Sequence, residues 1–198
     1  MTATLEFFYD YVSSYSYLAN VAVKSLSDVE VRYRPMFLGG VMNATGNNPP
    51  GTVPAKGRYL GQDLQRWARH YDVPFRFNSV FPQNTLSALR LALVAQHCGT
   101  FDAVHQPLFD AMYVHDRDLS DPAVLADIVT TAGLDAGHYA SQVVTQAIKD
   151  ELKENTEEAV ARGAFGAPTF FVGEQMFFGN DRFDFIRAAI ADAAKASG

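Results

Sequence analysis

The sequence predicts an α/β fold in which a large all-helical segment is inserted into a small domain built on a β-sheet. Apolar runs of strand length occur near the two ends of the chain, at residues 5–9, 29–37 and 169–178. Between these ends the apolar residues recur at helical spacing. We therefore predict that residues 1–50 and 164–198 form one discontinuous sheet domain, and that residues 51–163 form an inserted helical domain. The 198 residues, 48% of them hydrophobic, suffice for a packed core.

The first strand and the helix that follows it form the centre of the predicted fold. Residues 5–9 are apolar and aromatic without polar alternation, which indicates a central strand covered on both faces. After Asp10 the pattern becomes helical, so residues 12–16 should form the connection and the first helical turn. A helix N-terminus presents free N–H groups and a positive dipole end, and it stabilises an anion such as a thiolate. Ser13 lies where that anion would be, but Ser13 or Ser14 could equally be a simple N-cap.

The middle of the chain begins with a second strand at residues 29–37, which a right-handed βαβ crossover would place beside the first. Residues 39–57 are rich in Gly, Asn and Pro and predict a long loop of the kind that is commonly functional. From Tyr59 helical spacing resumes, and Pro74 ends that helix. Further helices are expected from residue 84 or 85 to 97, from 101 to 114, after Asp121-Pro122, after the capping Asp135, and before Gly163.

The last segment predicts a β-hairpin and a helix. Pro168 precedes an apolar run and can stand only at the start of a strand, and Ala167-Pro168 is our candidate for a cis bond that exposes backbone groups to a ligand. The final helix should begin near Asp181. Its Asn180 and Asp181 could cap it, or could bind an α-carboxylate and an ammonium group. The buried face of that helix is expected to carry Phe183, Ile186, Ile190 and Ala194.

Five motifs in order give the chain a specific resemblance to one family. Residues 8–19 are similar to F-x-D-x-x-S-P-Y-S-Y-L-A, residues 163–172 to G-V-F-G-V-P-T-F-F-V, and residues 178–182 to F/W-G-N/S-D-R. Residues 46–59 resemble a loop of kappa-class glutathione transferases, and residues 85–90 the helix after it. The chain thus resembles the DsbA-like branch of the thioredoxin superfamily that contains these transferases and the 2-hydroxychromene-2-carboxylate isomerases. The resemblance covers nearly the whole chain.

The resemblance implies a thioredoxin-like (DsbA-like) fold, a homodimer and glutathione as cofactor. Its site would place the cysteinyl unit of glutathione on the backbone at Ala167 and Pro168, with the sulfur pointing at Ser13. The resemblance also implies that four further residues contact the two ends of glutathione. The γ-glutamyl end would contact Asn180 and Asp181, and the glycyl side would contact Asn47 and Lys56.

The single cysteine, Cys98, limits the chemistry. It excludes an internal disulfide, which favours a reducing compartment, and with no signal peptide in the first residues we expect a cytoplasmic location. Residues 13–16 read Ser-Ser-Tyr-Ser where dithiol oxidoreductases have Cys-x-x-Cys, so disulfide exchange by the chain itself is excluded. The thiol would come from glutathione. A hydroxyl hydrogen bond and the helix dipole should lower its pKa from about 8.5.

A thiolate at this position has two uses, conjugation to an electrophile or reversible addition that allows rotation about a double bond. We favour the second, a glutathione-dependent cis–trans isomerase acting on a small aromatic carboxylate of the kind met in aromatic-hydrocarbon catabolism. Arg58, Arg90 and Lys56 are candidates for binding its carboxylate. Alternatives are a kappa-like transferase or peroxidase and a non-catalytic binding module. Ser14 replaces the family's Pro, and the isomerases' lysine near Met42 and tyrosine near Thr85 are absent.

Other function classes are disfavoured. The chain has 16 basic and 22 acidic residues without a basic cluster, which argues against nucleic acid or an anionic membrane as partner. No apolar run is long enough to span a bilayer. The five histidines are scattered without the pairing of a metal site, so no metal is predicted, and no phosphate-binding glycine motif occurs.

Overall fold

The computed structural model describes residues 2–196. Its sheet has the strand order β2-β1-β3-β4. β1 pairs in parallel with β2 and antiparallel with β3, and β3 pairs antiparallel with β4. The strands are β1 Ala3–Tyr9, β2 Val29–Pro35, β3 Thr169–Val172 and β4 Gln175–Phe178. The expected central position of the first strand is confirmed.

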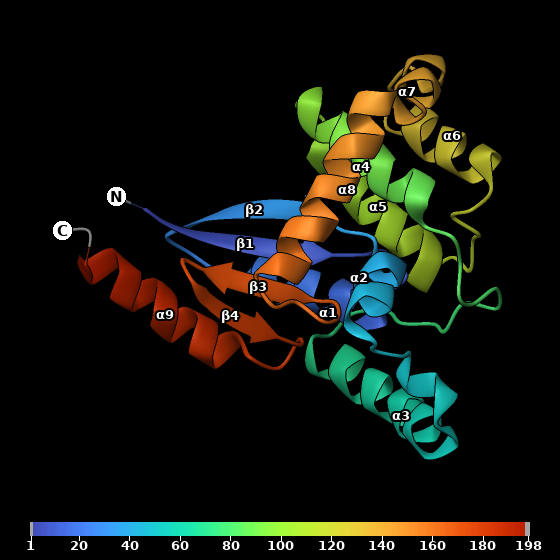
Figure 1. Ribbon diagram of the computed structural model, residues 1–198. Coiled ribbons are helices and arrows are strands. Elements are labelled where there is room, and N and C mark those ends of the chain that lie inside the picture. The colour runs from blue at the N-terminus through green and yellow to red at the C-terminus, as the bar shows by residue number, and fades with distance from the viewer. Residues whose placement is uncertain (1, 197–198) are drawn as a thin grey trace.

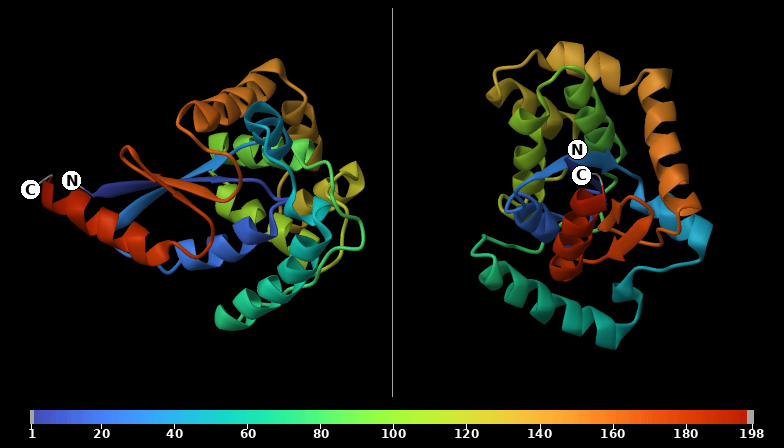
Figure 2. Two further views of the ribbon diagram at one scale, coloured as in Figure 1. Left: turned by 60° about the horizontal axis from the view of Figure 1, so that its bottom comes forward. Right: turned by 90° about the vertical axis from the view of Figure 1, so that its left-hand side faces the viewer.

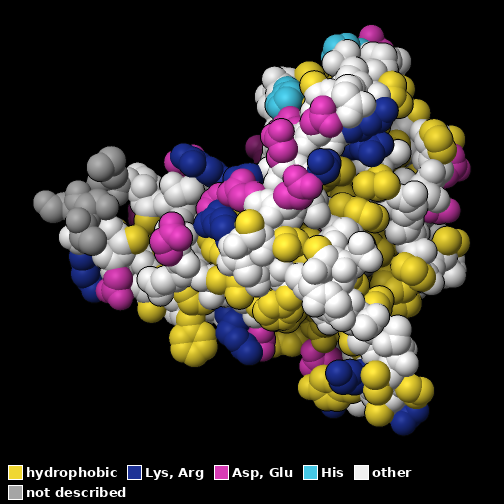
Figure 3. Space-filling view, in the orientation of Figure 1, with side chains coloured by type: hydrophobic (Ala, Val, Ile, Leu, Met, Phe, Trp, Pro, Cys, Tyr) yellow, Lys and Arg dark blue, Asp and Glu magenta, His cyan; other side chains and the backbone are white. Residues whose placement is uncertain are grey.

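Helices cover both faces of this sheet and form a separate cluster beyond its edge (Figure 1). In two further views α1 and α9 lie on one face and α8 on the other, while α3 projects from the body of the molecule (Figure 2). The face that carries α8 and α2 exposes hydrophobic side chains between these two helices (Figure 3). The helices are α1 Ser14–Val23, α2 Leu38–Thr45, α3 Pro54–His70, α4 Leu86–His97, α5 Phe101–Tyr113, α6 Pro122–Thr131, α7 Ala136–Val143, α8 Gln146–Ala161 and α9 Phe183–Ala196.

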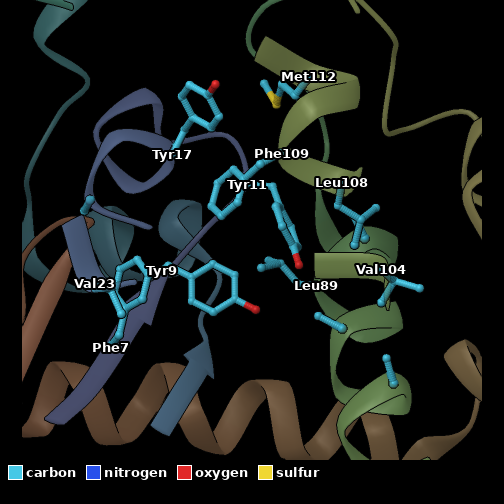
Figure 4. Packing of buried hydrophobic residues seen from close by; sticks show 14 of the residues in the cluster. Phe7, Tyr9, Tyr11, Tyr17, Val23, Leu89, Val104, Leu108, Phe109 and Met112 are labelled. Carbon is cyan, nitrogen blue, oxygen red and sulfur yellow. The ribbon is translucent and has the colours of Figure 1, made fainter. Parts of the chain in front are cut away.

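Two clusters of buried side chains flank the sheet. The larger one joins Phe7 and Tyr9 of β1 to α1, to α9 and to the inserted helices α4 and α5. Figure 4 shows Tyr9 and Tyr11 beside Phe109 of α5. The smaller cluster surrounds Phe8 under α2 and α8. The larger cluster thus joins the sheet to the inserted helices α4 and α5. The division of the chain into domains after residue 50 and residue 163 stays a prediction.

The middle of the chain differs from the prediction in one stretch. The loop expected at residues 39–57 contains α2, a 3-10 turn at Pro50–Thr52, and the start of α3, which begins at Pro54 rather than Tyr59. α2 was not predicted from the sequence, because its Gly39 and Gly40 disfavour a helix. A Cβ on Gly40 would lie 3.3 Å from both the Phe37 ring and the Thr156 methyl group, so close packing on α8 accounts for this glycine.

Most other helix boundaries agree closely with those predicted from the sequence. Asp121 and Asp135 cap α6 and α7 by accepting backbone N–H groups, as expected. Gly163 follows α8 with φ +98°, a left-handed conformation that suits glycine. In α9 the expected burial of Phe183, Ile186 and Ile190 is confirmed. That of Ala194 is wrong, since Ala194 is exposed in the last turn of the helix, and Ala189 is buried as well.

Candidate functional site

Ser13 lies at the N-terminus of α1 and is 7% exposed. Its hydroxyl accepts the Ser16 N–H at 3.1 Å and donates to the carbonyl oxygen of Ala167 at 3.0 Å. The first bond makes Ser13 the N-cap of α1, which was one of the two roles considered for this residue. The second joins the helix start to the segment before β3, which brings the two sequence motifs together.

Asp10 fixes the loop that presents Ser13. Its buried carboxylate accepts hydrogen bonds from the Val12 N–H at 3.1 Å, the Leu38 N–H at 2.8 Å and the Thr85 hydroxyl at 2.6 Å. Burial raises the pKa of this carboxyl, and the three hydrogen bonds oppose the shift. The Asp10 carbonyl also accepts the Ser13 N–H at 3.0 Å. Sequence reasoning missed this role, although a carboxylate directly after a buried strand was its signal.

The segment before β3 has the expected cis peptide bond between Ala167 and Pro168. The Thr169 hydroxyl donates to the carbonyl of Gly166 at 2.8 Å, and the Pro168 carbonyl accepts the Gly179 N–H at 3.0 Å. The backbone of this segment is therefore held from both sides. A second cis bond, Phe81-Pro82, was not expected.

Asn180 and Asp181 follow directly, in the turn before α9. The Asn180 carbonyl accepts the Tyr71 hydroxyl of α3's C-terminal end at 2.9 Å. The Asn180 side chain is buried, with the residue 3% exposed, yet its Nδ2 has no hydrogen-bond partner among residues 2–196. Asp181 is exposed and pairs with Arg182 at 2.6 Å. A buried amide without a partner is costly unless a ligand satisfies it.

Asn47 and Lys56 approach the same region from the other side. Asn47 donates from Nδ2 to the Phe165 carbonyl at 2.7 Å, two residues before Ala167. Lys56 lines a cavity of about 420 Å³ together with Tyr15, the second residue of α1. The Tyr15 hydroxyl donates to Asp63 of α3 at 2.7 Å, and burial with this carboxylate raises its pKa. α3 is thus attached to the helix that Ser13 caps.

The two arginines singled out in the sequence lie elsewhere. Arg58 is exposed on α3 and is not among the residues that line the Tyr15 cavity. Arg90 lies on α4 and lines a different cavity, between α2, α4 and α8. Within residues 2–196, no three His, Cys, Asp or Glu side chains gather as metal ligands would. No helix in that range is long and apolar enough to cross a membrane.

The sheet order, the helix-capping Ser13 and the cis peptide opposite it define a thioredoxin-like fold whose first helix lacks the cysteine pair. Residues 4–191 match the model of the DSBA-like thioredoxin domain, and the chain belongs to this family.

Two relatives and one solved structure show which members of this family the chain is similar to. The chain is 32% identical to the 2-hydroxychromene-2-carboxylate isomerase of Sphingobium xenophagum, over 97% of this chain and 100% of the relative. It is 30% identical to human glutathione S-transferase kappa 1, over 92% and 88%. A solved 2-hydroxychromene-2-carboxylate isomerase superposes with a TM-score of 0.88 at 26% identity, over 98% of this chain and 97% of the other. These relatives are enzymes, an isomerase and a transferase, and the expected DsbA-like fold is confirmed.

Proposed function

We propose that this protein is a glutathione-dependent cis–trans isomerase of the 2-hydroxychromene-2-carboxylate type. Its substrates would be 2-hydroxychromene-2-carboxylate and trans-o-hydroxybenzylidenepyruvate or a near analogue, within aromatic-compound catabolism. The observation that carries the proposal is the hydroxyl of Ser13 at the N-terminus of α1, bonded to Ala167 beside the cis peptide. The relatives' names support the reaction type.

The residues present fit glutathione. The Nδ2 of Asn180, without a partner in the described part of the chain, offers a buried donor to the α-carboxylate of a γ-glutamyl group. The neighbouring Asp181 can accept from the ammonium of that group. Asn47 and Lys56 would contact the glycyl side, and the backbone of Ala167 and Pro168 would contact the cysteinyl unit. The Asn47–Phe165 bond, the cavity beside Lys56 and the cis peptide support this assignment.

Bound glutathione would supply the nucleophile, a thiolate capable of reversible addition to a conjugated double bond. The chain's part is to hold that sulfur anionic. The Ser13 hydroxyl can turn from the Ala167 carbonyl to donate to the sulfur, and the free N–H groups of α1 add the positive end of the dipole. Of the cations proposed for the substrate carboxylate, Lys56 lines the cavity beside Tyr15 and Arg58 is exposed two residues away on α3.

A kappa-like transferase or peroxidase is the second candidate. Asn47, in the loop after α2, and Lys56, in the first turn of α3, stand at kappa-like positions and favour it, as does the human relative. The two activities differ in one measurable respect. An isomerase leaves glutathione unconsumed, whereas a transferase or peroxidase consumes it.

The deciding experiment is calorimetric titration with glutathione, followed by product analysis with chromene carboxylates. We expect saturable binding that Asp181→Ala weakens and that Asp184→Ala, a matched change at an exposed carboxylate of α9, leaves unchanged. Conversion of substrate at constant thiol content supports the isomerase, and a stable thioether supports the transferase. Absence of binding would remove both and leave a non-catalytic binding module.

We also propose a cytoplasmic homodimer, by analogy with the family. Light scattering of the purified chain at micromolar concentration tests the dimer, and a mass of one chain would refute it. Fractionation of the producing cells tests the location.

A further inference from the structure

A second cavity, of about 460 Å³, lies between α2, α4 and α8. It shares no lining residue with the cavity beside Tyr15. Ala44 of α2, Leu86 of α4 and Leu152 of α8 contribute apolar walls. Figure 3 shows the corresponding surface, where hydrophobic side chains gather between α8 and α2 with Lys and Arg side chains nearby. A volume of this size suits a small organic molecule.

Three cations line the same cavity, Arg90 from α4 and Lys149 and Lys153 from α8. The Nε–H of Arg90 is buried and has no hydrogen-bond partner in the described part of the chain. Neither Arg90 nor Lys149 forms an ion pair with any residue from 2 to 196. Lys153 pairs at 3.5 Å with the exposed Glu157, the one carboxylate in the cavity lining.

The three cations outnumber the one carboxylate in the lining, that of Glu157, so the cavity wall carries a net positive charge that favours an anionic ligand. Lys149 and Lys153 are four residues apart on one helix, a spacing at which like charges repel. Arg90 adds a third positive charge whose buried donor is not satisfied by the protein within residues 2–196. A guanidinium pairs best with a carboxylate, through two parallel hydrogen bonds.

We propose that this cavity is a second ligand site, for an amphipathic carboxylate whose aromatic or aliphatic body occupies the apolar walls. Arg90 binds the carboxylate, and Lys149 and Lys153 add electrostatic attraction at the rim. The Tyr15 cavity and the Ser13 hydroxyl take no part. The site therefore binds its ligand with or without glutathione. The proposal of this site does not depend on the isomerase reaction proposed above.

The test is calorimetric titration of the full chain with 2-naphthoate, and with the neutral 2-naphthalenemethanol as matched probe. We expect saturable binding of the carboxylate and at least tenfold weaker binding of the alcohol, since loss of a charge-assisted hydrogen bond is worth about a factor of ten or more. Arg90→Gln should weaken naphthoate binding about tenfold. Arg69→Gln, which removes an exposed arginine of α3, should leave it unchanged.

Two further measurements locate the site. Ala44→Leu places a larger side chain at an exposed helix position on the cavity wall and should weaken both probes, with the melting temperature as a folding check. Amide chemical shifts should change in α2, α4 and α8. Shifts confined to the start of α1 and the segment before β3 would overturn the proposal, as would naphthoate binding that Arg90→Gln and Lys149→Gln leave intact.

Discussion

The Ser13 hydroxyl reaches the carbonyl oxygen of Ala167, 154 residues further along the chain, at 3.0 Å. The Ser13 hydroxyl oxygen also caps α1 by accepting the Ser16 N–H. Structural and proposed chemical roles therefore coincide in one hydroxyl group. A substitution at Ser13 alters both unless the replacement preserves the cap, and glycine is the residue that does so.

Ser13→Gly and Ser13→Ala separate the two roles. Glycine is tolerated at an N-cap with a loss of a few tenths of a kcal/mol, whereas alanine costs about 1 kcal/mol. Both variants lack the hydroxyl, so both should raise the pKa of bound glutathione towards about 8.5 and lower turnover about a hundredfold. Chemical denaturation gives the stabilities, and thiolate absorbance against pH gives the pKa. Ser14→Ala is the control, and a bound-thiol pKa unchanged in Ser13→Gly would refute the role of Ser13.

Asn180→Leu should weaken glutathione binding at least tenfold without destabilising the free protein. The reason is its Nδ2, which has no partner within residues 2–196 and whose burial in the free protein carries a desolvation cost that an apolar side chain of similar size avoids. The matched control is Asn78→Leu. Asn78 is equally buried but donates to the Met112 and Arg117 carbonyls, so its loss should cost about 2–3 kcal/mol. Equal destabilisation by the two variants would show that Asn180 is satisfied within the protein.

Gly166→Ala should displace the segment before β3 and weaken glutathione binding. A Cβ at this position would lie 2.8 Å from the ring of Phe178, closer than unstrained contacts allow. Because the obstacle is one side chain, the double variant Gly166→Ala/Phe178→Ala should recover much of the affinity, a coupling that calorimetry on all four proteins measures. Gly61→Ala, in open space on α3, serves as control and should be neutral or stabilise by up to about 1 kcal/mol. Additive effects of the two changes would contradict this account.

His105 should make the protein less stable in mild acid. It is buried among aromatic rings, with Nδ1 bonded to the Tyr11 hydroxyl at 2.9 Å and Nε2 to Asn20 at 3.1 Å. Burial lowers its pKa well below the usual value, so below about pH 6.5 the unfolded chain binds a proton that the folded chain does not. The contribution of neutral His105 to the free energy of unfolding is complete above that pH and is lost as the pH falls.

The measurement is the free energy of unfolding from pH 8 to pH 5 for the wild type and for His105→Gln. The slope attributable to His105 approaches about 1.4 kcal/mol per pH unit below pH 6.5, and it should vanish in the variant. His138→Gln, at an exposed position, controls for the loss of one histidine. Parallel profiles for wild type and His105→Gln would mean that the histidine is protonated in the folded protein.

Local signals in the sequence predicted the strands, most helices and the helix caps, because caps and periodicity depend on neighbouring residues. The candidate cis bond at Pro168 came from the position of a proline at the start of an apolar strand, whereas the meeting of Ser13 with Ala167 followed from motif resemblance. Two of the three partners of the Asp10 carboxylate could not be predicted, since Leu38 and Thr85 lie 28 and 75 residues away. Thr85 stands where isomerase relatives were expected to have tyrosine, and here its short side chain reaches that carboxylate.

Arg90 shows a different limit. The sequence predicted the helix that carries Arg90. The cavity that Arg90 lines depends on how α2 and α8 pack, and α2 was not predicted because it contains two adjacent glycines. The expectation that Arg90 meets a carboxylate stays a prediction, now attached to a different cavity. Asn180 was readable as a helix-start residue, whereas its unsatisfied amide is a property of the folded interior alone.

The central place of β1 has a consequence for biosynthesis. β1 and β2 are complete within the first 35 residues, but the other edge of β1 pairs with β3, which the ribosome makes only after residue 168. During most of translation the growing chain therefore carries an apolar strand with one open edge, a template for pairing with other chains. Until β3 emerges, that edge depends on the helices already made, or on a chaperone, for protection.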